Sequence, residues 1–202
     1  MTLDKFRPLA DRALGPFVSA AKVAGLSPNG VSVIAFLLAL GAGGVYAVAA
    51  REPLLYLGGA VLVFLNGWLD LVDGALAREL NVASSGGDLL DHVLDRYADI
   101  GIIVGLAAGV SQWELGIAAV TGVLMTSYLG TQAQAVGLDR VYGGLLGRAD
   151  RLALVGVVTG VAAFVPTALA GLTLVGWLLV VFAVVGHVTA AQRFYHAMGA
   201  LE

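Results

Sequence analysis

Long apolar segments separated by short polar turns make up most of this chain. Six segments are apolar enough to predict membrane-spanning helices, for which about 20 residues are typical, and the turns between them carry Pro53 and the stretch NVASSGG at 81–87. We expect the helices at residues 31–49, 54–78, 88–110, 115–135, 151–165 and 169–188. The pattern predicts an all-α integral membrane protein with six transmembrane helices.

The first residues follow a different pattern. Residues 1–28 mix charged side chains with Leu, Phe and Val, and Pro8 and Pro16 interrupt the pattern. This mixture is typical of an amphipathic helix that lies on the membrane surface. Ser27 followed by Pro28 is a favourable start for the first spanning helix. We therefore expect one domain over 1–202, with an interfacial helix at 1–28 and a transmembrane core at 29–195.

The composition supports a membrane protein and excludes several other classes. Of the 202 residues, 59% are hydrophobic and 12% are charged, whereas soluble domains carry about 25% charged residues. The chain has no cysteine, which excludes disulfides and thiolate sites. Because it shows neither a basic patch nor an aromatic ladder, we expect no nucleic-acid partner.

The positive charges predict the orientation in the membrane. With six spans, ten of the eleven Lys and Arg residues fall on the side of the N-terminus, and only Arg51 falls on the other side. Positive residues concentrate on the cytoplasmic side of membrane proteins. We therefore expect a multi-pass protein of the cytoplasmic membrane, with both termini and the 70–95 region on the cytoplasmic side.

Four aspartates at the ends of two apolar segments are the candidate chemical centre. Asp70 and Asp73 share one helix face, and Asp91 and Asp95 share a face of the next helix. If these helices are antiparallel, the two pairs face each other. Ionised carboxylates beside an apolar run need compensation, and ligand sets made only of oxygen suit Mg²⁺ or Mn²⁺. The spacing therefore favours a divalent metal site.

The spacing of residues 70–95 is Asp-x2-Asp-Gly-x2-Ala-Arg-x8-Gly-x3-Asp-x3-Asp, which resembles the complete signature of the CDP-alcohol phosphotransferase family. The six-helix layout, the interfacial helix and Ser27-Pro28-Asn29 extend the resemblance to nearly the whole chain. It implies a membrane enzyme of phospholipid biosynthesis that moves a phosphatidyl-type group, diacyl or archaeal dialkyl glycerol phosphate, from a CDP-linked lipid to an alcohol and releases CMP. Members of the family commonly form homodimers.

The resemblance also implies roles for individual residues. Asp70, Asp73 and Asp91 would hold Mg²⁺ or Mn²⁺, and Asp95 would be a further metal ligand and the base that accepts the proton of the acceptor hydroxyl. Arg78 would contact the donor phosphates, and small side chains would leave room for the cytidine. The implied donor-binding residues are Asn29, Asp70, Gly74, Ala77, Arg78 and Gly87.

The acceptor is less well defined by the sequence. Ser127-Tyr128 and the Arg148-x-x-Arg151 spacing resemble the inositol-phosphate-using branch of the family, found in archaea and actinobacteria. The basic stretch of that branch on the fourth spanning helix is replaced by Gly130, Gln132 and Gln134, which removes cations from a phosphate pocket. Glycerol 3-phosphate, glycerol 1-phosphate and inositol phosphate all stay candidates. The candidate acceptor-binding residues are Arg140, Arg148, Arg151 and Gln132; alternatively, the arginines anchor the fifth spanning helix at lipid headgroups.

Two further alternatives concern the acidic residues. Asp99 either pairs with Arg96 or another helix, or supports the metal ligands. A cation transporter with an acidic site at the cytoplasmic edge is the alternative function. A transporter predicts acidic residues on several helices near the middle of the membrane, whereas here they gather at one edge, so the pattern favours the enzyme.

Overall fold

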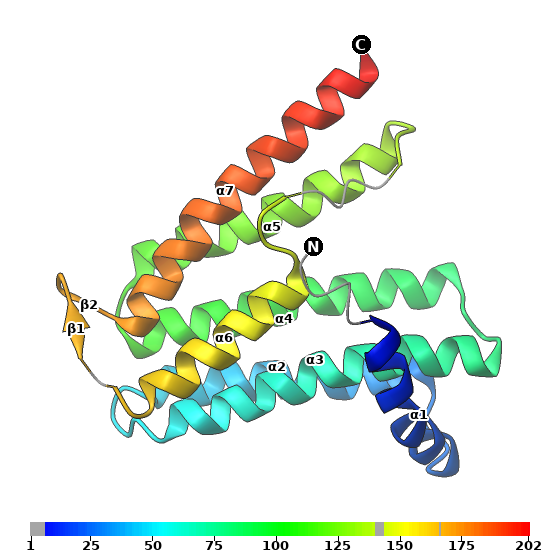
Figure 1. Cartoon of the computed structure of the whole chain (residues 1–202), viewed down its shortest axis with the longest axis horizontal. Helices are drawn as coiled ribbons and strands as arrows, with labels where there is room; N and C mark the ends of the chain where they lie inside the picture. The colour runs from blue at the N-terminus through cyan, green and yellow to red at the C-terminus, as the bar shows by residue number, and fades with distance from the viewer. Residues whose placement is uncertain (1–6, 140–143, 166) are drawn as a thin grey trace.

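The computed structural model describes residues 7–139, 144–165 and 167–202. In that part, the chain forms seven helices and one short antiparallel hairpin (Figure 1). The elements are α1 (Arg7–Val23), α2 (Pro28–Val48), α3 (Leu55–Leu80), α4 (Ser85–Gly109), α5 (Trp113–Ala135), α6 (Arg148–Ala162), β1 (Ala168–Leu169), β2 (Leu172–Thr173) and α7 (Leu174–Leu201). The predicted all-helical fold is confirmed. The helices that correspond to the first four predicted spans, α2 to α5, begin and end within three residues of the predicted limits.

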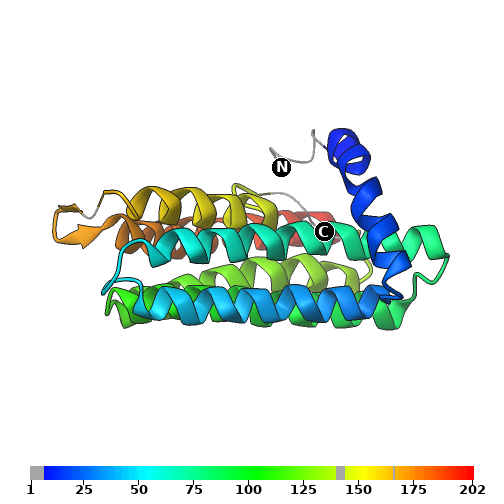
Figure 2. The ribbon, with the colours of Figure 1, turned by 90° about the horizontal axis from the view of Figure 1, so that it is seen from below.

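The helices form a bundle with α2 at the centre of one half. α2 packs along both α3 and α4, α6 packs on α3, and α5 packs on α7. α1 crosses the end of the bundle where α3 passes into α4, and the β1–β2 hairpin lies at the opposite end (Figure 2). Leu14, Val18 and Ala21 of α1 are buried with Val72 and Leu76 of α3. α1, within the segment predicted to be interfacial, is thus fixed to the end of the bundle that carries the signature.

Glycines set the spacing between two pairs of helices. A Cβ atom at Gly105 of α4 would overlap the backbone of Gly43 in α2, and a Cβ atom at Gly186 of α7 would lie 2.8 Å from the Gly122 carbonyl carbon of α5. Small residues let helix backbones approach closely in membrane proteins. The close approach of α2 and α4 holds the first turns of both helices at the same end of the bundle.

Three helix ends meet beside α1, and local hydrogen bonds define each of them. The Ser27 hydroxyl accepts a hydrogen bond from the Gly30 N–H of α2 (3.1 Å), and the Ser84 hydroxyl accepts one from the Gly87 N–H of α4 (3.2 Å). Both are N-caps of the predicted type. α3 ends at Asn81, whose φ of 55° places it in the left-handed region that commonly closes a helix.

The C-terminal part departs from the prediction. The last helix was expected at 169–188, but residues 168–173 form the hairpin, with positive φ at Ala170 and Gly171, and α7 runs from Leu174 to Leu201. Two left-handed residues in succession are typical of a tight hairpin turn. The apolar pattern stops near residue 188, but helix-forming residues continue beyond it, so the helix extends further than its apolar part.

Three of the described helices, α2, α3 and α7, are long and apolar enough to cross a membrane. α6 has 15 residues, which is shorter than the roughly 20 residues of a typical span. α4 carries five charged residues between Asp88 and Asp99. The helices are therefore of membrane type, and the count of six spans stays a prediction.

Candidate active site

Three of the four signature aspartates converge. Asp70 of α3 and Asp91 and Asp95 of α4 each offer a carboxylate oxygen, and these three oxygens lie within 4.8 Å of one another. Divalent metals bind oxygen ligands at about 2.0–2.6 Å, so oxygens on opposite sides of one ion lie about 4–5 Å apart. The donor set and its spacing therefore fit a hard divalent cation such as Mg²⁺ or Mn²⁺.

Asp73 is held slightly apart from these three by a contact that the sequence did not predict. Its side chain is 6% exposed, and one carboxylate oxygen accepts a hydrogen bond from the Ser32 hydroxyl of α2 at 2.6 Å. A signal for Ser32 was available: it is a polar residue in an apolar helix, one turn after Asn29 and on the same face.

A cavity of about 460 Å³ opens beside the aspartates, between the first turns of α2 and α4 and the end of α3. Asp73 and Asp91 lie in its wall. Five of the six predicted donor-binding residues also line it, namely Asn29, Gly74, Ala77, Arg78 and Gly87. A Cβ atom at Gly87 would lie 3.4 Å from the Asn29 side-chain oxygen, and one at Gly74 would lie 3.4 Å from an Arg78 guanidinium nitrogen. The two glycines therefore keep this wall of the cavity clear.

Asp70, the sixth predicted donor-binding residue, lines a different hollow. This is an apolar groove of about 770 Å³ between α3 and α6, bordered by Phe64, Trp68 and Leu152. Asp70 and Arg148 are its charged residues. Asp70 thus borders the groove, while its neighbour Asp73 faces the cavity. The four aspartates Asp70, Asp73, Asp91 and Asp95, called the acidic centre below, therefore lie between the cavity and the groove.

Arg148, the first residue of α6, lies directly on the acidic centre. Its guanidinium donates to Asp70 and forms an ion pair of 2.8 Å with Asp95. The side chain of Arg148 is 19% exposed and those of the two aspartates are 15% exposed, so these charges compensate one another in a largely buried place. The residue was predicted to bind the acceptor, and the structure places it at the aspartates.

Arg151 is buried deeper in the bundle. It is 5% exposed, and its Nη2 atom donates to Asp99 at 2.8 Å. Arg96 of α4 donates to the Ser127 hydroxyl of α5 and lies 3.9 Å from Asp99. Asp99 therefore pairs with Arg96 of its own helix and with Arg151 of α6, as the first of the two alternatives for Asp99 predicted. Arg96 and Ser127 had not been assigned to a site.

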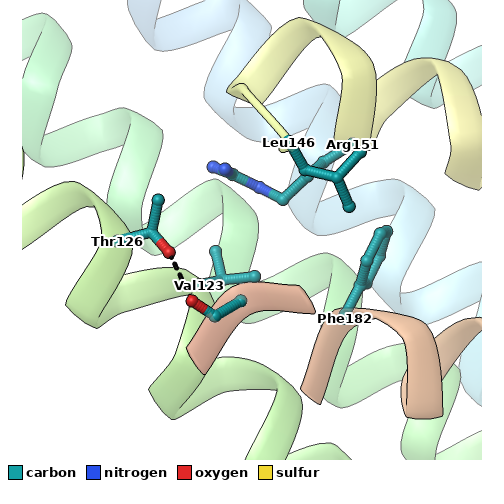
Figure 3. Close-up of a pocket in the computed structure, with 6 residues that line it drawn as sticks. Val123, Thr126, Leu146, Arg151 and Phe182 are labelled. Carbon is teal, nitrogen blue, oxygen red and sulfur yellow. Dashed lines mark hydrogen bonds between the residues drawn. The ribbon is translucent and has the colours of Figure 1, made fainter. Parts of the chain in front are cut away.

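A small pocket beside Arg151 shows how this side chain is packed (Figure 3). The guanidinium extends from α6 toward α5, where the Thr126 hydroxyl donates to the Gly186 carbonyl of α7 at 2.9 Å. Val123, Leu146 and Phe182 complete a mainly apolar lining. Arg151 is therefore set within the packing between α5, α6 and α7.

The two remaining predicted acceptor residues lie elsewhere. Gln132 is half-buried in the last turn of α5. Arg140 lies outside the described residues. The structure thus brings Arg148 and Arg151 together around Asp99, and the assignment of all four residues to an acceptor stays a prediction.

The fold and the site define a helical, membrane-type protein in which an acidic centre lies between a polar cavity and an apolar groove. Residues 25–189 match the family model described as CDP-alcohol phosphatidyltransferase, and the chain belongs to that family. The chain is therefore a transferase of substituted phosphate groups, as the signature implied.

Named relatives and solved structures resemble this chain over nearly its whole length. The archaetidylinositol phosphate synthases of Methanothermobacter thermautotrophicus and Pyrococcus horikoshii are 30% and 28% identical, over 99% of this chain and 96% and 98% of theirs. The crystal structure of Mycobacterium tuberculosis phosphatidylinositol phosphate synthase with CDP-DAG bound is 25% identical, covers 92% of this chain and 94% of that one, and gives a TM-score of 0.76. The structure of the same enzyme with manganese and citrate covers 92% and 88%, at 25% identity and a TM-score of 0.77.

Proposed function

We propose that this transferase takes a CDP-linked lipid as donor and an alcohol phosphate as acceptor, and releases CMP. The observation that carries the proposal is that Asn29, Gly74, Ala77, Arg78 and Gly87 line one cavity next to the convergent aspartates. The M. tuberculosis neighbour, which has CDP-DAG bound, supports a donor of this class.

The cavity is suited to the nucleotide end of the donor. The first turns of α2 and α4 both contribute to its wall through Asn29 and Gly87, and helix N-termini stabilise negative charge. Arg78 adds a guanidinium that can pair two phosphate oxygens at once. The cytidine would lie against Gly74 and Ala77, which carry almost no side chain.

The groove between α3 and α6 is suited to the lipid chains. It is lined mainly by aliphatic and aromatic side chains, and its charged residues, Asp70 and Arg148, lie at the acidic centre. A lipid in the groove with its nucleotide in the cavity would place its diphosphate at the aspartates. The donor would thus be held by apolar burial at one end and by polar contacts at the other.

The aspartates would hold Mg²⁺ or Mn²⁺ and position the acceptor hydroxyl. A bound divalent ion supplies positive charge that neutralises the diphosphate and the departing CMP. Asp70, Asp91 and Asp95 fit such an ion by their oxygen donors and spacing, and Asp73 lies beside them. Asp95 would also accept the proton of the attacking hydroxyl. The manganese complex of the M. tuberculosis enzyme is consistent with this chemistry.

The acceptor is proposed to carry a phosphate. Arg148 and Arg151 lie beside the acidic centre, where guanidinium groups can pair phosphate oxygens. Arg140 and Gln132 are further proposed acceptor contacts. The archaeal relatives named archaetidylinositol phosphate synthase favour inositol phosphate, whereas Gln132 and its neighbours in place of the basic stretch favour a less charged acceptor such as glycerol phosphate.

We further propose that the chain is a single domain whose six helices α2–α7 cross the cytoplasmic membrane, with α1 on its surface and the site facing the cytoplasm. The distribution of Lys and Arg supports this orientation. The exposed apolar side chains of the helices suit a lipid environment or a homodimer contact.

The test is a release assay with purified protein in detergent. CDP-diacylglycerol or its dialkyl counterpart, Mg²⁺ or Mn²⁺, and a panel of glycerol phosphates and inositol phosphate are supplied, and CMP is measured. We expect CMP release that depends on one acceptor of the panel and is lost in Asp91→Asn. A protein that binds Mn²⁺ but releases no CMP with any acceptor, and instead conducts metal ions across vesicles, would overturn the proposal in favour of a transporter.

A further inference from the structure

Arg148 and a divalent metal would need two of the same carboxylates. The guanidinium pairs with Asp70 through Nη1 and with Asp95 through Nη2, and these aspartates supply two of the three clustered ligand oxygens. In this largely buried place, each carboxylate needs one close cation as compensation. Two cations held against the same two carboxylates repel one another at short distance, so Arg148 competes with metal for this centre.

A second position for the guanidinium lies next to the first. Nε of Arg148 is 3.8 Å from Asp99, which also receives Arg151 at 2.8 Å and has Arg96 at 3.9 Å. An Arg148 side chain that leaves Asp70 and Asp95 would therefore still have Asp99 as a partner. Three guanidinium groups would then surround one carboxylate, which leaves an excess of positive charge.

The three guanidinium groups near Asp99 carry unused hydrogen-bond donors. The Nε atoms of Arg96, Arg148 and Arg151 are buried and form no hydrogen bond within the described part of the chain. A buried donor without a partner is unfavourable, and a guanidinium offers five donors. Three such donors around an excess of positive charge suit the oxygens of a phosphate or sulfate group.

We propose that Arg148 is a switch residue that couples metal binding to anion binding. In the metal-free protein its guanidinium neutralises Asp70 and Asp95. When these aspartates bind metal, the guanidinium turns to Asp99, where it joins Arg96 and Arg151 in holding the anionic group of the acceptor. This inference rests on the proposed metal site. By linkage, an anion at Asp99 must then increase metal affinity by the same factor by which metal increases anion affinity.

The coupling can be measured without turnover, from Mn²⁺ titrations of the purified protein followed by electron paramagnetic resonance. Arg148→Gln removes the competing charge, and we expect it to bind Mn²⁺ about 5- to 100-fold more tightly than the wild type, in the usual range of coupling between sites. Arg148→Lys keeps the charge but is a single ammonium that cannot span both aspartates, so its affinity should fall between the two.

Arg151→Gln is the matched control. It removes one positive charge from the same cluster but leaves the contacts of Arg148 with Asp70 and Asp95 in place. We expect its Mn²⁺ affinity to stay within about twofold of the wild type. An equal gain in Arg148→Gln and Arg151→Gln would show that only the general field changes and would overturn the switch. Arg96→Gln would not serve as this control, because the Arg96 guanidinium also contacts Asp95 at 3.5 Å.

The second measurement is made on the wild type. Sodium sulfate, the anion probe, should tighten Mn²⁺ binding relative to sodium chloride at equal ionic strength, and this gain should disappear in Arg148→Gln. A gain that persists in the variant, or no gain in the wild type, would overturn the coupling. If the wild type binds no Mn²⁺, the proposed metal site itself fails. If it binds Mn²⁺ and loses it in Asp91→Asn, but Arg148→Gln binds no more tightly, only the switch fails.

Discussion

The hydrogen bond between Ser32 and Asp73 gives a sharp test of how the acidic centre is held. The two side chains are 7% and 6% exposed. The Ser32 hydroxyl has a single proton, and its contact with Asp73 at 2.6 Å is shorter than its contact with the Pro28 carbonyl at 3.2 Å. Ser32→Ala therefore removes a charge-assisted hydrogen bond from a nearly buried carboxylate and changes little else.

The expected magnitude follows from that geometry. Hydrogen bonds to charged groups contribute about 1.5–3 kcal/mol, and about 1.4 kcal/mol corresponds to a factor of ten in affinity. If Asp73 helps to hold the metal, the loss falls on metal affinity, because the ligand is no longer oriented. We expect the Mn²⁺ concentration for half-maximal CMP release to rise about 10- to 100-fold in Ser32→Ala.

The assay is CMP release over a range of Mn²⁺ concentrations, with the melting temperature as a check of folding. Thr121→Ala is the matched control. The Thr121 residue is exposed, and its hydroxyl donates to carbonyls of its own helix, so this variant should leave the Mn²⁺ dependence unchanged. Ser32→Thr keeps a hydroxyl and should recover most of the affinity. A folded Ser32→Ala protein with an unaltered Mn²⁺ dependence would refute the role assigned to Asp73.

Three further predictions follow from the same geometry. Asp95→Asn should abolish CMP release while the protein still melts at a similar temperature, and turnover at the wild-type rate would remove Asp95 as the base. Gly74→Val should raise the KM for the CDP-lipid at least severalfold because its side chain enters the cavity; an unchanged KM in a folded protein would place the nucleotide elsewhere. Gly105→Ala should destabilise the bundle by about 1–3 kcal/mol in thermal unfolding, because the added methyl group overpacks against Gly43. Gly44→Ala is the control, since a Cβ atom there meets open space. Equal melting temperatures of the two variants would contradict the close approach of α2 and α4.

The sequence predicted those parts of the site that depend on local spacing. The limits of α3 followed from its apolar run and from turn residues such as Asn81. The i, i+3 and i, i+4 rule placed Asp73 and Gly74 on the face of Asp70, and Ala77 on the face of Asp73. The resemblance supplied Asn29 and Gly87. Each of these positions lies inside a helix or at a helix end, where the residues nearby in the sequence decide the geometry.

Contacts between distant helices could not be predicted in this way. Arg148 and Asp70 are 78 positions apart, Arg151 and Asp99 are 52 apart, and Ser32 and Asp73 are 41 apart. Helical periodicity says which face a residue occupies but not which other helix that face meets. The arginines were therefore assigned to an acceptor by resemblance, and their pairing with the aspartates emerged only from the packing of α6 on α3.

The arrangement of helices explains why one end of the bundle can carry so much charge. The first part of α3 (residues 55–65) and the second part of α4 (residues 100–109) are apolar. Their charged parts lie at the same end of the bundle because the chain reverses at residues 81–84. α2 packs between them and is held against α4 at Gly43 and Gly105. Hydrophobic packing along the rest of the bundle thus fixes the positions of carboxylates that would otherwise repel one another, and a cation at their centre, whether guanidinium or metal, is required to keep them there.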